Sequence, residues 1–361
     1  MPKTPSIDLL RRLCLASGPP GAEDAVRAIV RDAIAGVGDL SFDRLGSVLC
    51  EVPGSADAPR VVLDCHLDEV GFMVQSISRE GRVRFVPLGG WWGHVLLGKR
   101  VDVLASGDKV PGVIAAKSPR FLGADERNRV MDIEAMYIDL GATDRAQVEQ
   151  LGVRVGDPIA PHGEWVELGV EGALSCKAFD NRAGVGVMCE VLASLAGGNH
   201  PNTLVGVGSV QEEVGLRGAE TSSRVAKPDL AIVLECAPAD DGPGVSEPQG
   251  VLGGGPQIRH YDPTAVGNRR LIEFVDSVAD TCGIPIQHAV RRTGGTDAGA
   301  IHRHGAGVPA VVVAVPARYI HTHTSVLQWS DYEAACRLVG EIVSRLDASR
   351  VEAFTRFGSE A

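Results

Sequence analysis

The sequence lacks the features that mark membrane, secreted and nucleic-acid-binding proteins. Its longest apolar run, residues 308–316, has the length of a strand and falls well short of the roughly 20 residues that a membrane-spanning helix needs. No charged segment followed by an apolar run opens the chain, so we expect no secretory signal peptide. Basic residues are outnumbered, with 35 Lys and Arg against 46 Asp and Glu, and the net charge of −11 argues against a nucleic-acid partner.

The eight cysteines show none of the paired spacing that zinc ribbons or redox motifs use. Several lie in apolar segments typical of strands or helices, which favours buried, reduced thiols and a cytoplasmic protein. No internal repeat or low-complexity tract is visible. A chain of 361 residues with 44% hydrophobic side chains can form one large core or two smaller ones.

Apolar runs and helical periodicities alternate over most of the chain. The patterns predict strands at 61–65, 203–210, 230–235, 285–290 and 309–315, and helices at 6–16, 23–35, 181–196, 217–225, 265–282 and 330–347. Strands that alternate with helices favour an α/β fold, in which a mostly parallel sheet is flanked by helices. We assign residues 1–72 and 164–361 to this domain.

Residues 73–163 interrupt that alternation after a single strand. Short alternating segments separated by glycine turns lie at 73–77, 82–86, 100–104, 109–114 and 136–140. This spacing is typical of a small β-barrel or sandwich, so we predict an inserted β-barrel domain. Residues 118–129 within it are charged and weakly periodic, and we expect a mobile loop there.

Two adjacent glutamates, Glu212 and Glu213, are the most informative residues of the chain. They follow the predicted strand 203–210 and precede Gly215, so both carboxyl groups fall at the C-terminal end of a strand. Open α/β sheets bind their ligands at that edge. Adjacent carboxylates repel each other unless a positive group lies beside them. Taken alone, the pair could also be a solvated strand end.

His66 and Asp68 follow directly on the first predicted strand. Residues two apart share a face of an extended backbone, so the Asp68 carboxylate can hold the imidazole of His66 in one orientation. Such a carboxylate commonly supports a metal-bound histidine. A single His-x-Asp triplet is weak evidence, because polar surface residues produce the same pattern.

Asp180, Glu235 and His321 lie at comparable places. Asp180 comes just before a predicted helix, where it could cap the helix; its two oxygens could instead bridge two cations. Glu235 ends an apolar strand, where an unpaired carboxylate would be costly to bury. His321 comes just past the last predicted strand.

Five of these side chains could supply two divalent cations with three ligands each if Asp180 is shared: His66, Asp180, Glu213, Glu235 and His321. Imidazole nitrogen and carboxylate oxygen suit Zn²⁺, Co²⁺ or Mn²⁺. Glu212 then remains beside a ligand with no metal of its own, which suits a general base acting on water.

In these segments the chain resembles the M42 family of co-catalytic metallo-aminopeptidases, the glutamyl/leucyl aminopeptidase-like, tetrahedral aminopeptidase type. The matching segments follow the family's order and spacing: residues 17–19, 66–72, 177–182, 211–215, 294–299 and 315–321. The resemblance covers nearly the whole chain, insert included. It implies an aminopeptidase that removes N-terminal residues from short peptides.

The resemblance also implies roles for single residues: one metal held by His66, Asp180 and Glu235, the other by Asp180, Glu213 and His321, Glu212 as general base, and Asp68 as the residue that orients His66. The inserted barrel would drive dimerisation, and dimers would assemble into a hollow tetrahedral dodecamer. The implied partners are short peptides and copies of the chain itself, not nucleic acid or a membrane.

Two positions depart from the family. Glu235 stands where Asp is more frequent, which keeps the carboxylate and lengthens the side chain by one methylene. His323 stands where a small polar residue is common; we expect a surface histidine, with contact to the substrate as the alternative. We expect the substrate pocket to be lined by the loops around 237–256 and 290–297.

Two other functions compete with the aminopeptidase. A dinuclear deacylase of N-acyl amino acids would need a cation for the substrate carboxylate; Arg182 and Arg318 are the nearby candidates, and we expect both to make structural ion pairs instead. A non-catalytic scaffold with the same fold would have no need of Glu212 beside Glu213.

Overall fold

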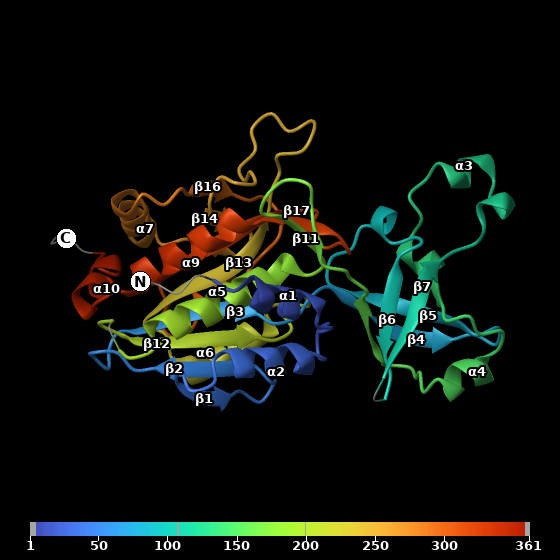
Figure 1. Cartoon of the computed structure of the whole chain (residues 1–361), viewed down its shortest axis with the longest axis horizontal. Coiled ribbons are helices and arrows are strands. Elements are labelled where there is room, and N and C mark those ends of the chain that lie inside the picture. Colours follow the sequence, from blue (N-terminus) through green and yellow to red (C-terminus); the bar gives the residue numbers. More distant parts are fainter. Residues whose placement is uncertain (1–4, 107, 199, 358–361) are drawn as a thin grey trace.

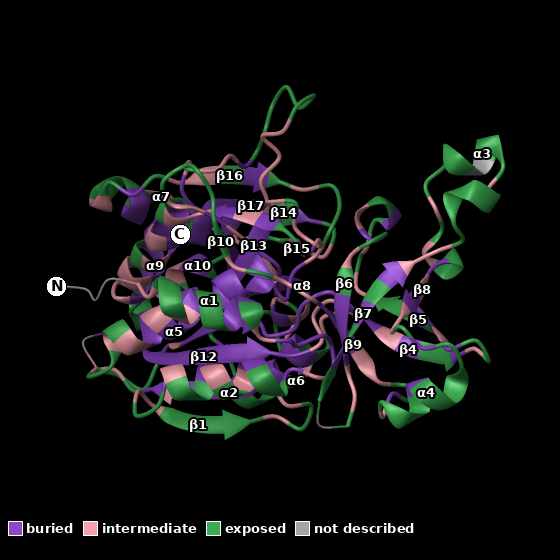
Figure 2. Ribbon diagram, turned by 45° about the vertical axis from the view of Figure 1, so that its right-hand side comes forward, coloured by how far each residue is buried: buried purple, intermediate pink, exposed green. Residues whose placement is uncertain are grey.

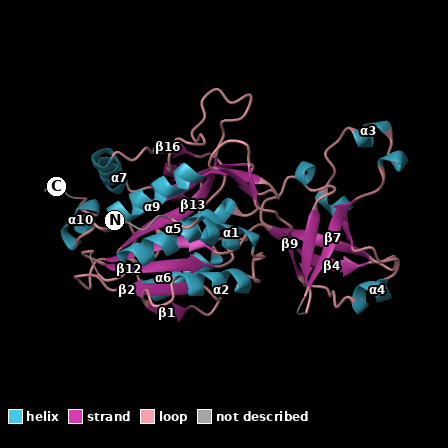
Figure 3. Ribbon diagram, in the orientation of Figure 1, coloured by secondary structure: helices cyan, strands magenta, loops and turns pink. Residues whose placement is uncertain are grey.

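The computed structural model describes residues 5–106, 108–198 and 200–357 and shows an α/β domain beside a closed β-barrel (Figure 1). The α/β domain contains a twelve-stranded mixed sheet covered by helices (Figure 3). Both termini of the described chain lie on the α/β side, far from the barrel. The predicted fold class is confirmed.

Four parallel strands form the centre of the sheet, in the order β12 (Thr203–Ser209), β3 (Arg60–His66), β13 (Leu230–Pro238) and β17 (Ala310–Arg318). Their sequences are nearly continuous apolar runs, as strands buried on both faces require. Successive residues of β3 point to opposite faces, so Val61 and Leu63 enter the larger hydrophobic cluster and Val62 enters a smaller one behind the sheet. Figure 2 shows β12 buried along its whole length.

Further strands, joined to it mostly by antiparallel pairing, extend this parallel centre, and the sequence predicted few of them. They are β1 (Asp39–Phe42) and β2 (Val48–Val52) beside β12, and β18 (Ser325–Gln328), β11 (Ala173–Cys176) and β10 (Val166–Glu167) beyond β17, with β14 (Gln257–Asp262), β15 (Ala265–Val266) and β16 (Gln287–Val290) branching from β17. Most are short, and β1 is exposed along its length, so their apolar alternation is weak.

Helices cover both faces of the sheet. One face carries α1 (Ile7–Leu15), α2 (Asp24–Ala33), α5 (Phe179–Leu195) and α9 (Trp329–Val343); the other carries α6 (Arg217–Ala226) and α8 (Ala298–Ile301); α7 (Arg269–Cys282) and α10 (Ala348–Phe354) complete the domain. Helix α5 lies close to β13 because Gly184 has no side chain there: a Cβ at this position would meet the Leu234 carbonyl oxygen at 2.6 Å.

Helix α7 begins four residues later than predicted. Residues Ala265–Val266 form β15 instead, and Gly267 separates this strand from the helix. The Asn268 side chain accepts a hydrogen bond from the Leu271 amide at 3.0 Å and so caps the first turn. The helix therefore starts at its cap and not at the first apolar residue of the pattern.

Six antiparallel strands close the barrel in the order β4 (Gly71–Ile77), β5 (Arg82–Leu88), β8 (Tyr137–Asp139), β7 (Lys109–Ala115), β6 (Arg100–Leu104) and β9 (Pro158–Pro161). Burial alternates along β7, as expected when one face of a strand fills a barrel core. The sequence missed β9 and the helix α4 (Arg145–Gln150). The expected loop at 118–129 contains two short helical turns, Pro119–Phe121 and α3 (Ala124–Arg127).

Two further expectations concern the chain as a whole. Among the residues that the structure describes, no helix has the length and apolar character needed to cross a bilayer. All eight cysteines are free thiols, and six of them are buried.

Candidate active site

The polar residues singled out by their sequence positions meet at the carboxyl edge of the parallel strands. His66 ends β3, Glu235 lies near the end of β13, Glu212 and Glu213 follow β12, His321 follows β17, and Asp180 lies in the first turn of α5. Because β12, β3, β13 and β17 are parallel neighbours, their carboxyl ends share one edge of the sheet. This geometry brings together residues from five separate segments.

Asp180 lies between the two histidines. Its Oδ1 is 3.3 Å from His66 Nε2, and its Oδ2 is 3.3 Å from His321 Nε2. The structure does not show Asp180 capping α5: the Gly184 amide in the first turn donates instead to Asn181 Oδ1 at 3.0 Å, while the Asp180 oxygens face the imidazoles. One carboxylate whose two oxygens face two imidazoles has the arrangement that a bridging ligand needs.

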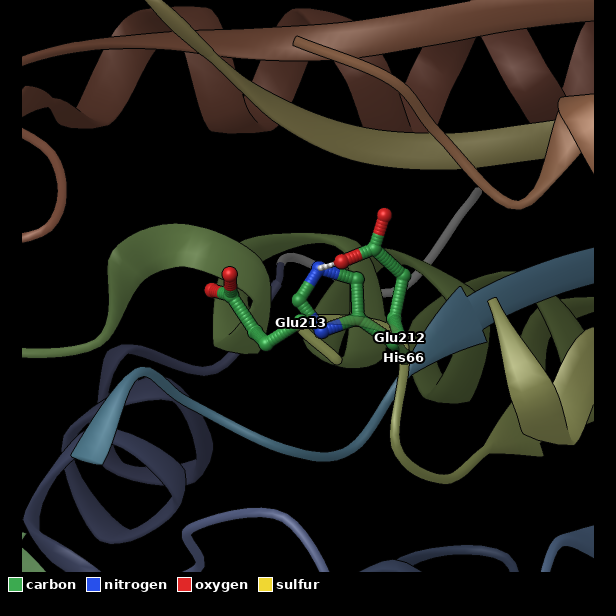
Figure 4. A group of neighbouring side chains, drawn as sticks. All are labelled: His66, Glu212 and Glu213. Atoms are coloured by element: carbon green, nitrogen blue, oxygen red, sulfur yellow. Dashed lines mark ion pairs between the residues drawn. The ribbon is translucent and has the colours of Figure 1, made fainter. Parts of the chain in front are cut away.

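The remaining carboxylates surround the same two imidazoles. Glu235 Oε2 and Glu212 Oε2 lie 3.7 Å and 3.9 Å from His66 Nε2, and Glu213 Oε1 lies 3.4 Å from His321 Nε2. Figure 4 shows the Glu212 carboxylate facing the His66 ring, while that of Glu213 points to a different side. The two adjacent glutamates therefore lie next to different histidines, Glu212 next to His66 and Glu213 next to His321.

Both imidazoles are oriented by backbone carbonyl groups. His66 Nδ1 lies 3.1 Å from the Asp68 carbonyl oxygen, and His321 Nδ1 lies 2.9 Å from that of Gly90. A carbonyl can only accept, so each Nδ1 carries the proton and each Nε2 faces the carboxylates. This is the orientation of metal-binding histidines, whose second nitrogen donates to an outer partner.

Asp68 differs in detail from the expectation. Its carboxylate is 3.6 Å from His66 Nδ1, farther than its own carbonyl oxygen. The two carboxylate oxygens instead accept hydrogen bonds from the backbone amides of Glu212 (3.0 Å) and Glu213 (3.1 Å). Fully buried, Asp68 holds the turn that carries both glutamates.

The site concentrates negative charge away from water. Burial raises the pKa of Glu213 to about 8 and that of Glu235 to about 7, and nearby carboxylates such as Asp180 add to both shifts. Burial also raises the pKa of Glu212. Burial acts in the same direction on Asp180, but hydrogen bonds from His321 and His66 outweigh it and keep the pKa of Asp180 below its usual value. The site thus has more buried carboxylate than its own residues can neutralise.

Divalent cations would fit this donor set. Ligand atoms lie within 4.8 Å of one another in the sets His66–Asp180–Glu235, Asp180–Glu213–His321 and His66–Glu212–Glu213. Glu213 Oε1 is buried without a hydrogen-bond donor among the described residues. Imidazole nitrogen and carboxylate oxygen are ligands for Zn²⁺, Co²⁺ or Mn²⁺.

A buried ion network lies next to the site in the sequence, beside Asp68. Glu69, next to Asp68, accepts from Lys177 Nζ at 2.6 Å and lies 3.3 Å from Arg182 Nη2. Arg182 is thus in a structural ion pair, as expected, and so is Arg318, whose Nε lies 2.6 Å from Asp241 Oδ1. Neither arginine is left free to bind a substrate carboxylate.

His323 is not a surface histidine, so that expectation is wrong. Its side chain is buried, its Nε2 donates to the Arg100 carbonyl oxygen at 3.0 Å, and its ring lies 5.7 Å from that of Trp91. Both partners belong to the barrel side of the molecule. The barrel covers this histidine, and the contact joins the barrel to the segment that carries His321.

Two glycines that follow β5 also belong to the site, although no sequence prediction included them. Gly89 has φ +87°, and a Cβ there would lie 3.1 Å from Glu213 Oε2; Gly90 holds His321 through its carbonyl. The signal was the Gly-Gly-Trp run at 89–91, where two adjacent glycines permit close backbone approach. The barrel therefore forms one wall of the site.

Comparison with known proteins identifies the family. The sequence model of the M42 glutamyl aminopeptidase family matches residues 46–338. The chain belongs to the M42 family. It is 33% identical to the glutamyl aminopeptidase of Lactococcus lactis over 348 residues, which are 95% of this chain and 97% of that protein. This M42 chain is accordingly an aminopeptidase-family hydrolase that acts on peptides, as the resemblance predicted.

Solved structures of M42 peptidases share the fold. The TET aminopeptidase from Thaumarchaeota archaeon SCGC AB-539-E09 superposes with a TM-score of 0.94 at 43% identity, covering 97% of this chain and 99% of that one. The TET1 peptidase of Pyrococcus horikoshii, described as assembling into a tetrahedron or a large octahedral shell, superposes with a TM-score of 0.84 at 28% identity, covering 94% and 99%.

Proposed function

We propose that this M42 peptidase removes single residues from the free N-terminus of short peptides with two divalent cations and Glu212 as general base. His66, Asp180 and Glu235 hold one cation, and Asp180, Glu213 and His321 hold the other. The observation that carries this assignment is the position of Asp180, whose two oxygens each lie 3.3 Å from a different imidazole Nε2. Zn²⁺ or Co²⁺ fit these donors, and Mn²⁺ is a third candidate.

When bound, the cations would lower the pKa of a water molecule and polarise the carbonyl group of the scissile peptide bond. Glu212 accepts the proton that this water loses as its oxygen bonds to the carbonyl carbon. When the carbon–nitrogen bond breaks, Glu212 returns the proton to the departing amine. Its Oε2 faces His66 at 3.9 Å, and it belongs to neither of the two proposed ligand sets. A carboxylate at the margin of the ligands is free to carry a proton.

Asp68 and Gly90 act as positioning residues. The Asp68 carboxylate accepts hydrogen bonds from the backbone amides of Glu212 and Glu213. It thereby fixes the position of the proposed base and of one proposed metal ligand. The Gly90 carbonyl fixes the proton of His321 on Nδ1. Both contacts act on residues of the site through hydrogen bonds at or below 3.1 Å.

Charge favours an aminopeptidase over a deacylase. Carboxylate oxygens of the site (Asp180, Glu212, Glu213 and Glu235) that the cations leave free accept hydrogen bonds from the ammonium group of a free N-terminus. A deacylase needs a cation for the substrate carboxylate at the same place, but Arg182 is paired with Glu69, and Arg318 with Asp241.

Aminoacyl anilides test this assignment after reconstitution of the protein with each metal. Leucyl- and glutamyl-anilides with a free amine should be cleaved, and their N-acetylated counterparts should be inert. Faster turnover of the acetylated compounds, or of free N-acetyl amino acids, would replace the aminopeptidase with the deacylase. A protein that binds two metals and cleaves none of these compounds would support the non-catalytic scaffold.

The assembly belongs to the same proposal. Dimers form through the barrel (73–163) and build a hollow dodecamer, as the described tetrahedral assembly of the Pyrococcus horikoshii relative suggests. Apolar side chains exposed on the barrel support this, among them Phe121 at 74% and Val130 at 47% exposure. Light scattering of the purified protein should give a particle of twelve chains; a monomer would contradict the proposal.

A further inference from the structure

A cavity lies next to the candidate active site, at the junction of the barrel and the α/β domain. Its volume is about 550 Å³, which falls in the range of small-molecule sites. His321 forms part of its lining, so the cavity borders one of the proposed metal ligands. The other walls come from barrel residues between Gly90 and Lys99 and from the segment between Tyr319 and Thr324.

Two exposed aromatic rings flank this junction cavity. Trp92 and Tyr319 are each 63% exposed, although large rings are normally covered. Tyr319 and His321 both have left-handed backbone conformations, with φ of 58° and 56°. Such conformations are uncommon for side chains of this size and persist where the surrounding structure holds them. The turn thus sets an aromatic wall and a proposed metal ligand on the same cavity.

The junction cavity contains a cationic side chain. Lys99 lines it and is half-buried, and its ammonium group has no ion pair or hydrogen bond with any described residue. No Asp or Glu among the described residues lines the cavity. A half-buried cation without a partner is a place where an anionic group gains a charge-assisted hydrogen bond.

We infer that the junction cavity binds the carboxyl side of a short peptide substrate, with Lys99 as the partner of its C-terminal carboxylate. This inference rests on the proposed function. A short peptide at neutral pH is positive at its N-terminus and negative at its C-terminus. Lys99 lines the cavity together with His321 and offers a cation to the negative end. Each residue of an extended chain advances about 3.3 Å, so the terminal carboxylate of a di- or tripeptide remains close to the scissile bond. The enzyme therefore prefers short peptides with a free C-terminal carboxylate.

Matched peptides with a free or an amidated C-terminus test the role of Lys99. A charge-assisted hydrogen bond of about 1.5–3 kcal/mol corresponds to roughly a 10- to 100-fold preference in kcat/KM for the free acid. Lys99→Gln should bring the acid-to-amide ratio close to one, and Lys99→Arg should keep most of it. Lys109→Gln, at an exposed lysine that begins β7 of the same barrel, is the matched control and should keep both ratio and activity. An unchanged ratio in Lys99→Gln would overturn the inference.

Trp92→Ala separates a peptide site from an interface between two copies of the chain. We expect a higher KM for tripeptides and an unchanged particle size in light scattering. A smaller particle with an unchanged KM would mean that a second copy covers the cavity, and would overturn the inference.

The failure of this inference is distinguishable from the failure of the proposed function. Leucyl-anilide has a free amine but no carboxylate, so its hydrolysis by the unmodified enzyme tests the proposed function alone. If the anilide is cleaved and the acid-to-amide ratio of the unmodified enzyme is close to one, only the inference about the junction cavity fails.

Discussion

Replacement of Glu69 by Gln should destabilise the protein by at least about 3 kcal/mol, because breaking a buried ion pair leaves an uncompensated charge. Glu69, Lys177 and Arg182 are each at most 2% exposed. Gln keeps the shape and removes the charge. Lys177 and Arg182 would retain their bonds to backbone carbonyl oxygens, of Ala16 and Leu67, so the lower end of the usual range of 3–5 kcal/mol applies.

The expected change in melting temperature follows from the size of the protein. An unfolding entropy of about 2.1 cal/mol/K per residue amounts to about 0.8 kcal/mol/K for 361 residues, so a loss of about 3 kcal/mol lowers Tm by about 4 °C. Thermal unfolding followed by circular dichroism, at fixed metal concentration, measures the shift.

Glu220→Gln is the matched control for this experiment. Its ion pair with Arg224 has the same 2.6 Å separation as that of Glu69 with Lys177, but both side chains are about two-thirds exposed. Exposed pairs of this kind contribute about 0.3–0.5 kcal/mol, so Tm should change by less than 1 °C. Equal shifts for the two variants would refute the argument that burial decides the cost.

Four further variants test the site. Glu212→Gln should keep two metals per chain and lower kcat by at least about 10²-fold, as loss of a general base does; near-normal turnover of the metal-replete variant would exclude that role. Asp180→Ala should empty both metal positions, whereas Glu235→Ala should weaken mainly one; elemental analysis that finds two metals in Asp180→Ala would place the bridge elsewhere. Gly89→Ala should weaken metal binding beside Glu213. The added Cβ would lie 3.1 Å from Glu213 Oε2, and the φ of +87° at this position is unfavourable for alanine. Unchanged metal affinity in a calorimetric titration would contradict this.

The centre of the fold could be predicted from the sequence because its signals are local. The run 61–65 is apolar except for Asp64, as expected of a strand buried on both faces. The proposed ligands were found for a related reason: they lie near the carboxyl ends of parallel strands or in the first turn of a helix, and parallel strands share an edge. Position in the chain was therefore enough to group them.

The features that the sequence did not predict depend on contacts between residues far apart in the chain. Gly90 and His321 are 231 positions apart, and no local pattern links a carbonyl oxygen to an imidazole. His323 stands where a small polar residue is common in the family, which suggested a surface position, but Arg100 and Trp91 of the barrel side cover it. The strand β18 is only four residues long, and its pairing with β11 and β17 decides its structure.

The hydrogen bond from His321 to Gly90 links the two domains thermodynamically. In the proposed ligand set, the His321 imidazole binds the metal best when the Gly90 carbonyl fixes its orientation. Metal binding therefore favours the state in which the barrel is folded and packed against the α/β domain. By reciprocity, a loosened barrel lowers metal affinity by the same free energy. We expect the metal-loaded chain to unfold as one cooperative unit, while the metal-free barrel can open on its own.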